Sequence, residues 1–483
     1  MSFGLRRLWG RARPETVPDE RDKYSFIVCP NCGLTYDRPQ HYCQRCHFYA
    51  AQWWWRSGTA QPRSPWRMRA LLIGILLALV LGYLGYEFHP FIPNPLNFFK
   101  LPSTRLSAPI GPGTWAEFGL TSAHVRYVPE KALPVGRVRW SLSLGPPTFS
   151  SPAVVDGVVY VGAHFRVLAL EAATGRQLWE SKTTGPVHAS PVVAGSRLYL
   201  GLLDGRIIAL DRMSGRPAWE FQTENFVFSS AVVKDGRLFI GSGDESVYCL
   251  DAETGRVLWR TWIGGRALSA PAVQDGIVYA AADNRNLHSL SARTGARRLM
   301  FRMAQDIVES PVVADGLVYF TARDGRLYTI RHGAREWPGQ FQMTWLWIQF
   351  WLWRLPVPTP PTQAGAAWRF NPKYPRLGFV SPPAVTPEAF YMGDRLGIFY
   401  ACEAARAKPL WRFRIRSPIL ESPLVVGDRV YFGAEDGRLY ALERQTGQLA
   451  WQLDLGTPVM AGPVFGAGLI FVRTKDGMLH AIE

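Results

Sequence analysis

The sequence is poor in cysteine. Only six cysteines occur among 483 residues, no two of them are adjacent, and four lie between Cys29 and Cys46. The other two, Cys249 and Cys402, stand far apart. This distribution excludes a small scaffold held together by disulfide bonds.

Acidic residues are also few, and the resulting positive charge is concentrated near the N-terminus. The chain has 38 Asp and Glu against 54 Lys and Arg, a net charge of +16. Residues 1–69 hold 12 basic and 5 acidic residues, so they carry +7 of this total. The remaining charge is spread thinly over a long stretch, which is typical of a solvated surface. We therefore do not expect nucleic acid as a partner.

No charged residue interrupts the stretch from Ala70 to Tyr86, which reads ALLIGILLALVLGYLGY. As a helix these 17 residues would be about 26 Å long, enough for a short membrane span. A signal peptide would instead lie within about the first 30 residues and end at a small-residue cleavage site. Arginines precede the stretch at positions 56, 63, 67 and 69. The positive-inside rule then predicts a transmembrane helix over 70–88 in the cytoplasmic membrane, with the N-terminus cytoplasmic and the rest extracytoplasmic.

The predicted helix divides the chain into parts of different composition. We expect a basic N-terminal tail (1–24), a zinc ribbon (25–50), a basic juxtamembrane linker (51–69), a Pro-rich spacer (89–135) and a large C-terminal domain (136–483). The spacer, being irregular and rich in proline, would hold the C-terminal domain away from the membrane.

Two cysteine pairs form the motif CPNCGLTYDRPQHYCQRC. Two Cys-x2-Cys knuckles can hold one zinc ion in a tetrahedron of four thiolates, and such a short segment would depend on the metal for folding. Two disulfides or a redox pair are the alternatives, but both fit a reducing cytoplasm badly. The sequence predicts a structural zinc site with the ligands Cys29, Cys32, Cys43 and Cys46.

The C-terminal domain repeats itself about every 40 residues, the period of a four-stranded propeller blade. Each repeat has a Ser/Pro-led apolar run, such as SPAVV at 151, and then a turn and an alternating strand, such as DGVVYVG at 156. A Thr-Gly turn and a tryptophan follow, as in YCLDAETGRVLW, which ends at Trp259. The alternation, the tight turns and the recurring aromatic residue fit strands packed between neighbouring sheets.

The spacing of the repeats gives the number of blades. Repeat starts lie near residues 151, 190, 230, 270, 310, 382, 422 and 462. The long step after 310 indicates an insertion at about 331–367. The strand around Trp140 precedes the first start, and the last repeat ends at Glu483 without a tryptophan strand. We therefore predict an all-β, eight-bladed propeller of four-stranded blades in which the Trp140 strand completes the last blade.

The segment AxDxxTGxxxW resembles the repeat signature of the PQQ-like (quinoprotein) propellers, and YCLDAETGRVLW matches it closely. The resemblance covers residues 136–483 and includes a non-enzymatic, BamB-like branch. The enzymatic branch has an adjacent Cys-Cys disulfide over the cofactor, an Asp base, and Glu and Asn calcium ligands. This chain has no adjacent cysteines. Glu309, Glu421 and His188 are expected near the central channel, as rim or solvated residues rather than ligands, so we expect neither bound PQQ nor enzyme activity.

The insertion is rich in aromatic residues and reads MTWLWIQFWLWRLPVPTPP. Residues 343–355 are too few to span a bilayer as a helix. They could form a flap on the propeller's own surface, or contact the membrane interface or a partner protein. We take the contact residues to be Trp345, Trp347, Phe350, Trp351 and Trp353.

The sequence thus favours a membrane-anchored extracytoplasmic propeller that acts as a protein-binding scaffold or assembly factor in the bacterial cell envelope. Its expected partners are other membrane or envelope proteins. The alternative is a PQQ-binding oxidoreductase or a small-molecule sensor that uses the central channel.

Overall fold

The computed structural model describes residues 27–28, 32–36, 44–45, 65–109, 111, 113–130, 133–307, 309–372 and 378–483. The chain separates into two compact units, Met1–Gly85 and Tyr86–Glu483. Each unit is described by itself.

The first unit contains a small hairpin and most of a long helix. Strand β1 (Ile27–Val28) pairs antiparallel with β2 (Thr35–Tyr36). Gly33 has a φ of 73° in the turn between them, as expected for a knuckle turn. Of the predicted zinc ligands only Cys32, which is partly exposed, belongs to the described residues; Cys29, Cys43 and Cys46 lie outside them.

Helix α1 (Pro65–Phe88) covers the apolar stretch, and its described large apolar side chains are exposed, for example Leu72 and Leu76. Its side chains are described for residues 70–83 and 85. Within the described residues, no helix is long and apolar enough to cross a membrane. The transmembrane helix expected over 70–88 stays a prediction.

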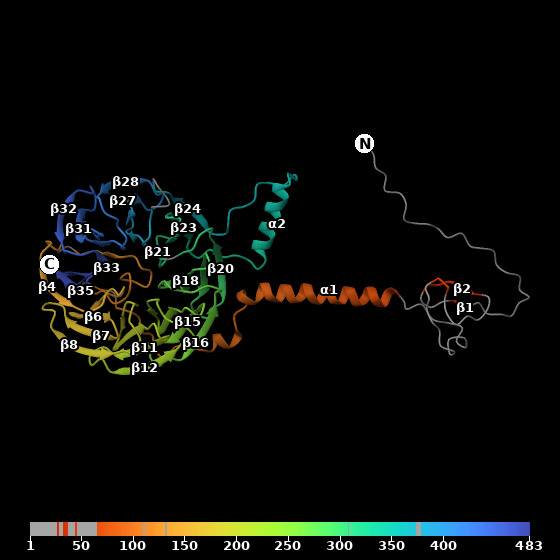
Figure 1. Ribbon diagram of the computed structural model, residues 1–483, viewed down its shortest axis with the longest axis horizontal. Helices are drawn as coiled ribbons and strands as arrows, with labels where there is room; N and C mark the ends of the chain where they lie inside the picture. Colours follow the sequence, from red (N-terminus) through yellow and green to blue (C-terminus); the bar gives the residue numbers. More distant parts are fainter. Residues whose placement is uncertain are drawn as a thin grey trace, which may run out of the picture. The chain divides into compact units, whose positions relative to one another are not determined.

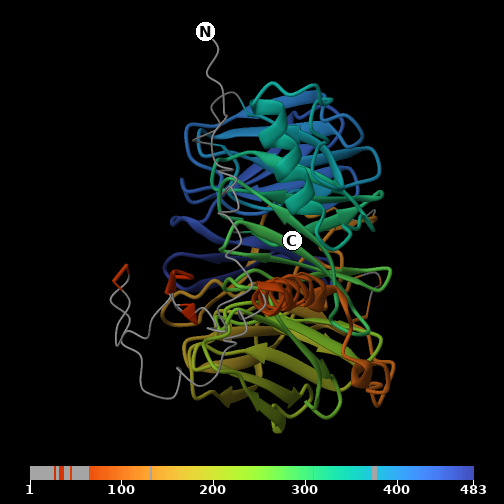
Figure 2. The same ribbon diagram turned by 90° about the vertical axis from the view of Figure 1, so that its right-hand side faces the viewer.

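The second unit is a β-propeller, which confirms the predicted fold. Its described residues form eight antiparallel four-stranded blades around a common centre (Figure 1), and Figure 2 shows them turned by 90°. The strands of blades one to four are β5 (Ala153–Val155), β6 (Val158–Ala163), β7 (Arg166–Glu171), β8 (Gln177–Lys182); β9 (Val192–Ala194), β10 (Arg197–Gly201), β11 (Arg206–Asp211), β12 (Pro217–Gln222); β13 (Val232–Lys234), β14 (Arg237–Gly241), β15 (Ser246–Asp251), β16 (Val257–Trp262); and β17 (Ala272–Gln274), β18 (Ile277–Ala282), β19 (Asn286–Ser291), β20 (Arg297–Arg302).

Blades five to eight follow the same plan. Their strands are β21 (Val312–Ala314), β22 (Leu317–Thr321), β23 (Leu327–Arg331), β24 (Ala366–Phe370); β25 (Ala384–Val385), β26 (Ala389–Gly393), β27 (Ile398–Glu403), β28 (Pro409–Arg414); β29 (Leu424–Val426), β30 (Arg429–Gly433), β31 (Arg438–Glu443), β32 (Leu449–Asp454); and β33 (Val459–Gly466), β34 (Leu469–Thr474), β35 (Met478–Ile482), β4 (Val138–Ser143).

The first strand of each blade is innermost, because the first strands of neighbouring blades contact one another. The connections between blades and the turns between second and third strands lie on one side of the ring, which we call the mouth face. The other two sets of turns lie on the opposite side, the rear face.

The ring closes as predicted from the repeat register. Strand β4 pairs antiparallel with β35, so Trp140 lies opposite Ala481 and completes the last blade. The N-terminal and C-terminal parts of the domain therefore share one sheet, which leaves no unpaired edge at the join.

The tryptophan and the Thr-Gly turn of the repeat motif meet between blades. In six blades the indole Nε1 donates to a carbonyl 2.9–3.1 Å away, and for Trp140 and Trp179 the acceptors are Ala172 and Arg212 on the next blade. A Cβ on Gly175 would lie 2.8 Å from the Trp140 ring, and Gly215 faces Trp179 in the same way. The glycine is needed both for its positive φ and for room beneath the indole.

The serines of the Ser-Pro motif link the inner strands. The backbone N–H of Ser151 donates to the Ser190 hydroxyl at 3.0 Å, and that of Ser190 donates to the Ser230 hydroxyl at 2.8 Å. The N–H of Ala270 donates to Ser310 in the same manner. These bonds satisfy buried donors and tie blades one, two and four each to the following blade.

The segment predicted as a spacer (89–135) is irregular but is bound to the propeller, and this corrects the expectation. It contains the 3-10 turns η2 (His89–Phe91) and η3 (Pro95–Phe98) and the short strand β3 (Tyr127–Val128), which joins blade seven beside β29. The Asn97 amide donates to the Thr294 carbonyl, and Ser103 donates to Asp251 at 2.6 Å. Its part before residue 108 bonds to turns on the rear face, for example Leu106, whose carbonyl accepts from Gly236. This pattern leaves no periodic signal in the sequence.

The aromatic insertion forms a helix, α2 (Gln340–Leu352), between β23 and β24 of blade five. Figure 1 shows α2 standing off the rim of the ring. None of its residues is buried.

Candidate functional site at the propeller channel

A segment of the chain lines the inner strands at the centre of the ring. We call residues 115–128 the channel segment. It hydrogen-bonds to the inner strands of successive blades: Trp115 pairs with Val154, and the carbonyls of Ala116, Ser122, Ala123, Val125 and Arg126 accept from the amides of Val193, Val273, Val313, Val385 and Val425. The segment thus runs around the inner edges of the blades, at the centre of the ring.

Arg126 fixes the end of the channel segment. Its guanidinium is buried and donates to the Pro423 carbonyl at 2.8 Å and to the Pro463 carbonyl at 2.9 Å. It also lies 5.2 Å from the centre of the Trp115 ring. Burial lowers the pKa of Arg126 to about 10, so the group stays charged at neutral pH. This one side chain joins the seventh and eighth blades to the beginning of the segment.

Two further ionisable groups of the channel segment are buried. Burial raises the pKa of Glu117 to about 8, although a hydrogen bond from the Val233 backbone opposes this shift. Burial lowers the pKa of His124 to about 4, and its Nδ1 lies 2.9 Å from the Pro311 carbonyl. Both side chains are therefore mostly neutral near pH 7 and serve the packing of the channel.

The backbone of the channel segment takes an unusual path. Leu120, His124 and Arg126 have φ values of 75°, 62° and 56°, in the left-handed region that residues other than glycine seldom adopt. This conformation lets consecutive carbonyls point to different blades. Such a path is retained only where the surrounding hydrogen bonds outweigh its strain.

On the mouth face, aromatic rings from the first three blades form a cluster. The centroids of Phe149 and His188, and of His188 and Phe228, are 5.6 Å apart, and those of Phe149 and Phe228 are 6.0 Å apart. Phe149 is 52% exposed. Burial is the main cause that lowers the pKa of His188, so its ring is neutral at pH 7 and adds apolar surface to the cluster.

Two carboxyl groups precede the inner strands of blades five and seven. Glu309 and Glu421 are partly exposed and stand just before the serines of the Ser-Pro motif, near the channel as predicted. Burial raises the pKa of each to about 8, the charge of Glu421 further raises that of Glu309, and Arg126 opposes the shift at Glu421. The mouth of the channel therefore combines aromatic rings with two weakly acidic carboxyl groups.

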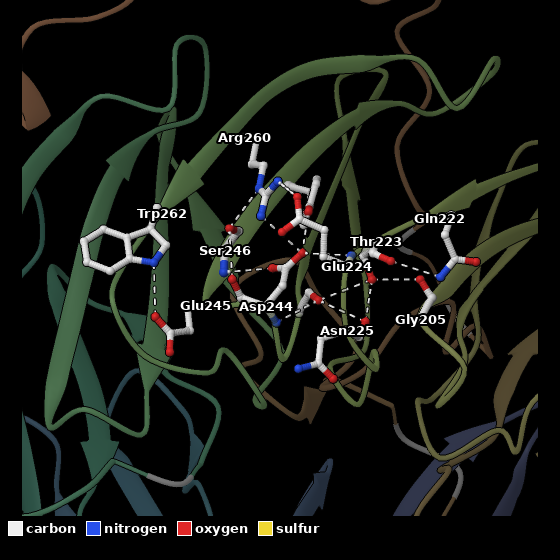
Figure 3. A network of polar contacts seen from close by, with 12 residues as sticks. Gly205, Gln222, Thr223, Glu224, Asn225, Asp244, Glu245, Ser246, Arg260 and Trp262 are labelled. Carbon is white, nitrogen blue, oxygen red and sulfur yellow. Dashed lines mark hydrogen bonds and ion pairs between the residues drawn. The ribbon is translucent and has the colours of Figure 1, made fainter.

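A polar network fixes the neighbouring loops of the mouth face, as Figure 3 shows. Arg260 donates to Glu224 at 2.5 Å and to Ser246 at 3.0 Å, and it lies 3.5 Å from Asp244. Trp262, which is 68% exposed, donates its indole N–H to Glu245. These contacts make the loops of the second and third blades a defined surface rather than free segments.

A cavity of about 370 Å³ lies on the mouth face between blades four and five. The charged residues that line the cavity form ion pairs with one another. Arg266 lies 2.6 Å from Asp283, and Arg323 lies 3.6 Å from Asp306. This balance of charge favours a structural role over recognition of an ion.

Two features of the structure bear on the quinone cofactor of the family's enzymes. The Trp115 ring and the Arg126 guanidinium lie where the channel segment bonds to the inner strands of the blades. Cys249 and Cys402 lie in β15 and β27, in separate blades, so they cannot form the adjacent disulfide. Burial raises the pKa of both thiols, that of Cys402 to about 12, as expected for inert core residues.

The predicted aromatic contact residues are all exposed on or next to α2. Trp345, Trp347, Phe350, Trp351 and Trp353 are 52, 38, 40, 46 and 68% exposed. Trp347 also donates its indole N–H to the Pro358 carbonyl at 2.8 Å. The structure brings these residues together in one helix at the rim, away from the aromatic cluster at the mouth. Their contact with a membrane or a partner remains a prediction.

The repeat pattern does not identify Glu117, His124 and Arg126 as channel residues. The signal available for them is that they interrupt an otherwise mostly uncharged run between Trp115 and Val128, before the strand around Trp140. Without a repeat period, however, this run could not be distinguished from the Pro-rich residues before it.

Comparison with known proteins agrees with this architecture. The sequence model of a family described as "Outer membrane protein assembly factor BamB" matches residues 130–230, 225–298, 272–343 and 352–483. Among curated proteins, the quinohemoprotein alcohol dehydrogenase ADH IIB of Pseudomonas putida is 30% identical over 113 residues, which cover 20% of this chain. The match spans only 16% of that enzyme's length.

Solved structures share the fold at low sequence identity. The quinohemoprotein alcohol dehydrogenase of Comamonas testosteroni is 16% identical, with a TM-score of 0.61 over 77% of this chain and 80% of the enzyme. BamB of Moraxella catarrhalis is 17% identical, with a TM-score of 0.55 over 72% of this chain and 98% of BamB. Both an enzyme and an assembly factor therefore have this ring.

Proposed function

The chain belongs to the PQQ-like repeat family whose sequence model is described as outer membrane protein assembly factor BamB, and we propose that it is a protein-binding scaffold of the cell envelope. In this proposal the propeller lies outside the cytoplasm and is held at the cytoplasmic membrane by the single helix over residues 70–88. Its mouth face binds segments of other membrane or envelope proteins.

The occupied channel carries the proposal. In this proposal the channel segment takes up space that a cofactor at the centre of the ring would need, because it is bonded to the inner strands of successive blades. What remains accessible is the surface around it, with Phe149 exposed beside His188 and Phe228. Exposed aromatic rings on fixed loops are typical of protein-binding surfaces.

The same proposal assigns roles to the N-terminal parts. The four cysteines 29, 32, 43 and 46 would hold one structural zinc ion on the cytoplasmic side, which the hairpin β1–β2 and the Gly33 turn support. The exposed apolar side chains of α1 support its place in a bilayer. Metal analysis of the purified protein should find about one zinc per chain. Less than about half an equivalent would contradict the site.

Affinity purification of the full-length protein from its native membrane tests the scaffold function. The double variant Phe149→Asp/Phe228→Asp places two charges in the aromatic cluster. The control is Leu178→Asp, at an exposed apolar position on β8, far from the mouth. We expect co-purifying proteins to fall about tenfold with the double variant and to stay unchanged with the control. Equal recovery with wild type and both variants would contradict binding at the mouth face.

The second candidate function is a quinoprotein-type oxidoreductase, which the curated relative ADH IIB favours. Incubation with PQQ and calcium, followed by measurement of the quinone absorbance after gel filtration, distinguishes the two functions. We expect no retained quinone. Stable binding of one quinone per chain would overturn the scaffold proposal.

A further inference from the structure

Helix α2 has large apolar side chains on every side. Its 13 residues, QFQMTWLWIQFWL, include no charged residue, and none of them is buried. Trp345 and Trp347 are separated by about 200° around a helix, and both are exposed. A groove on a partner protein would cover one side of such a helix, whereas a surrounding apolar medium would accommodate all sides.

The base of α2 is fixed to the outer strand of blade four. Phe341 lies 3.9 Å below the Arg302 guanidinium, measured from ring centroid to Cζ. Just before the helix, Glu336 accepts from the Met300 backbone and pairs with Arg302 at 3.4 Å. The remainder of the helix extends beyond this anchor, so its exposed position is set by the ring.

The same strand anchors the beginning of the propeller unit. Phe91 of η2 lies 4.7 Å from the Arg297 guanidinium, at the start of β20, and Arg302 stands at the end of that strand. Five residues of β-strand span about 17 Å. The point where the chain enters the propeller from α1 and the base of α2 are therefore neighbours on one rim.

Charge on the flanks of α2 is positive. Arg331, Arg335 and Arg354 are exposed on either side of the helix. The one acidic residue nearby, Glu336, is already paired with Arg302 and lies 3.9 Å from Arg297. Exposed arginines beside an apolar, tryptophan-rich helix complement the phosphate groups of anionic lipids.

We propose that α2 lies in the interfacial region of a lipid bilayer and turns the rim of blades four and five toward the membrane. The inference rests on the proposed attachment of the chain to a membrane. The helix is about 20 Å long, too short to span the bilayer but suited to the headgroup boundary, where tryptophan is preferred. The mouth face then stays accessible to proteins beside the membrane.

Photocrosslinking of the full-length protein in native membranes tests this proposal. A benzophenone amino acid replaces Trp345 or Trp347, on opposite sides of α2, or Leu178 on the rim of blade one as the matched control. The same probe at Leu77 of α1 reports membrane attachment itself. After irradiation, mass spectrometry distinguishes adducts with a phospholipid from adducts with a protein.

We expect phospholipid adducts at both α2 positions with about ten times the yield found at Leu178. Protein adducts that outnumber lipid adducts at either position, or a lipid yield equal to that at Leu178, would overturn the proposal. If lipid adducts form at Leu77 but not on α2, the interfacial helix alone is wrong. If they form at neither place, the membrane attachment fails as well.

Discussion

The channel segment and α2 are two parts of the propeller unit that do not follow the repeat, and in each the exposure of the side chains is the opposite of what its composition suggests. The channel segment carries Glu117, His124 and Arg126, yet these side chains are buried at the centre of the ring. Helix α2 carries no charge and many aromatic residues, yet it is exposed. In the channel segment, burial of the Arg126 guanidinium and of the backbone carbonyls goes with hydrogen-bond partners from the blades.

The largest effect on stability is expected when the channel segment loses the Arg126 side chain. The variant Arg126→Ala removes the donors to Pro423 and Pro463 and leaves a cavity beside Trp115. We expect the free energy of unfolding to fall by about 3–5 kcal/mol, as for other buried charges that lose their network. Chemical denaturation of the purified protein measures this. Arg216→Ala, at an exposed position, is the control and should change stability by less than about 0.5 kcal/mol.

The second prediction concerns Glu117, whose pKa is raised to about 8 by burial. A carboxyl group with a raised pKa in the folded state favours folding below its unfolded pKa, and this contribution is lost as pH rises through about 8. Glu117→Gln keeps an acceptor for Val233 and cannot ionise. At pH 9 it should be more stable than wild type by about 3–5 kcal/mol, with little difference at pH 4. Parallel pH profiles of the two proteins would contradict the burial of this carboxyl group.

A smaller effect is expected from the ring of serines next to the channel segment. Ser190→Ala leaves the buried N–H of Ser151 without its acceptor, which should cost about 1–2 kcal/mol. Ala270 holds the position in blade four that Ser190 holds in blade two, and it has no hydroxyl group, so it serves as the comparison. Ala270→Ser should therefore be tolerated within about 1 kcal/mol. Thermal unfolding of both variants measures the difference, and an equal loss in both would show that side-chain size rather than hydrogen bonding decides.

The smallest effect is expected at α2. The double variant Trp345→Gln/Trp351→Gln changes two exposed residues that hold no blade in place. In detergent, the free energy of unfolding of the propeller should change by less than about 1 kcal/mol. A loss as large as that of Arg126→Ala would mean that α2 packs on the ring, and the contrast between the two regions would disappear.

Most of the fold could be predicted because the same sequence motif recurs in most of the blades. The Trp259 and Gly295 pair, for example, recurs from blade to blade because every sheet must pack on the next one in the same way. The join through Trp140 followed from the same period. The path of residues 115–128 could not be predicted, because its bonds to the blades are made by backbone atoms and by left-handed residues such as Leu120. Likewise, alternating Trp345 and Trp347 permitted either a strand or a helix, and only the structure decides for the helix.

The path of the channel segment also bears on the order of assembly. Residues 115–128 are made before any blade, whereas the last sheet is completed only when β35 pairs with β4 at the C-terminus. On both sides of the segment the chain contacts rear-face turns, since Leu106 accepts from Gly236 and Val128 accepts from Gly427. The segment can therefore dock from the rear face, and the slow step is the pairing of β4 with β35 across the whole length of the domain.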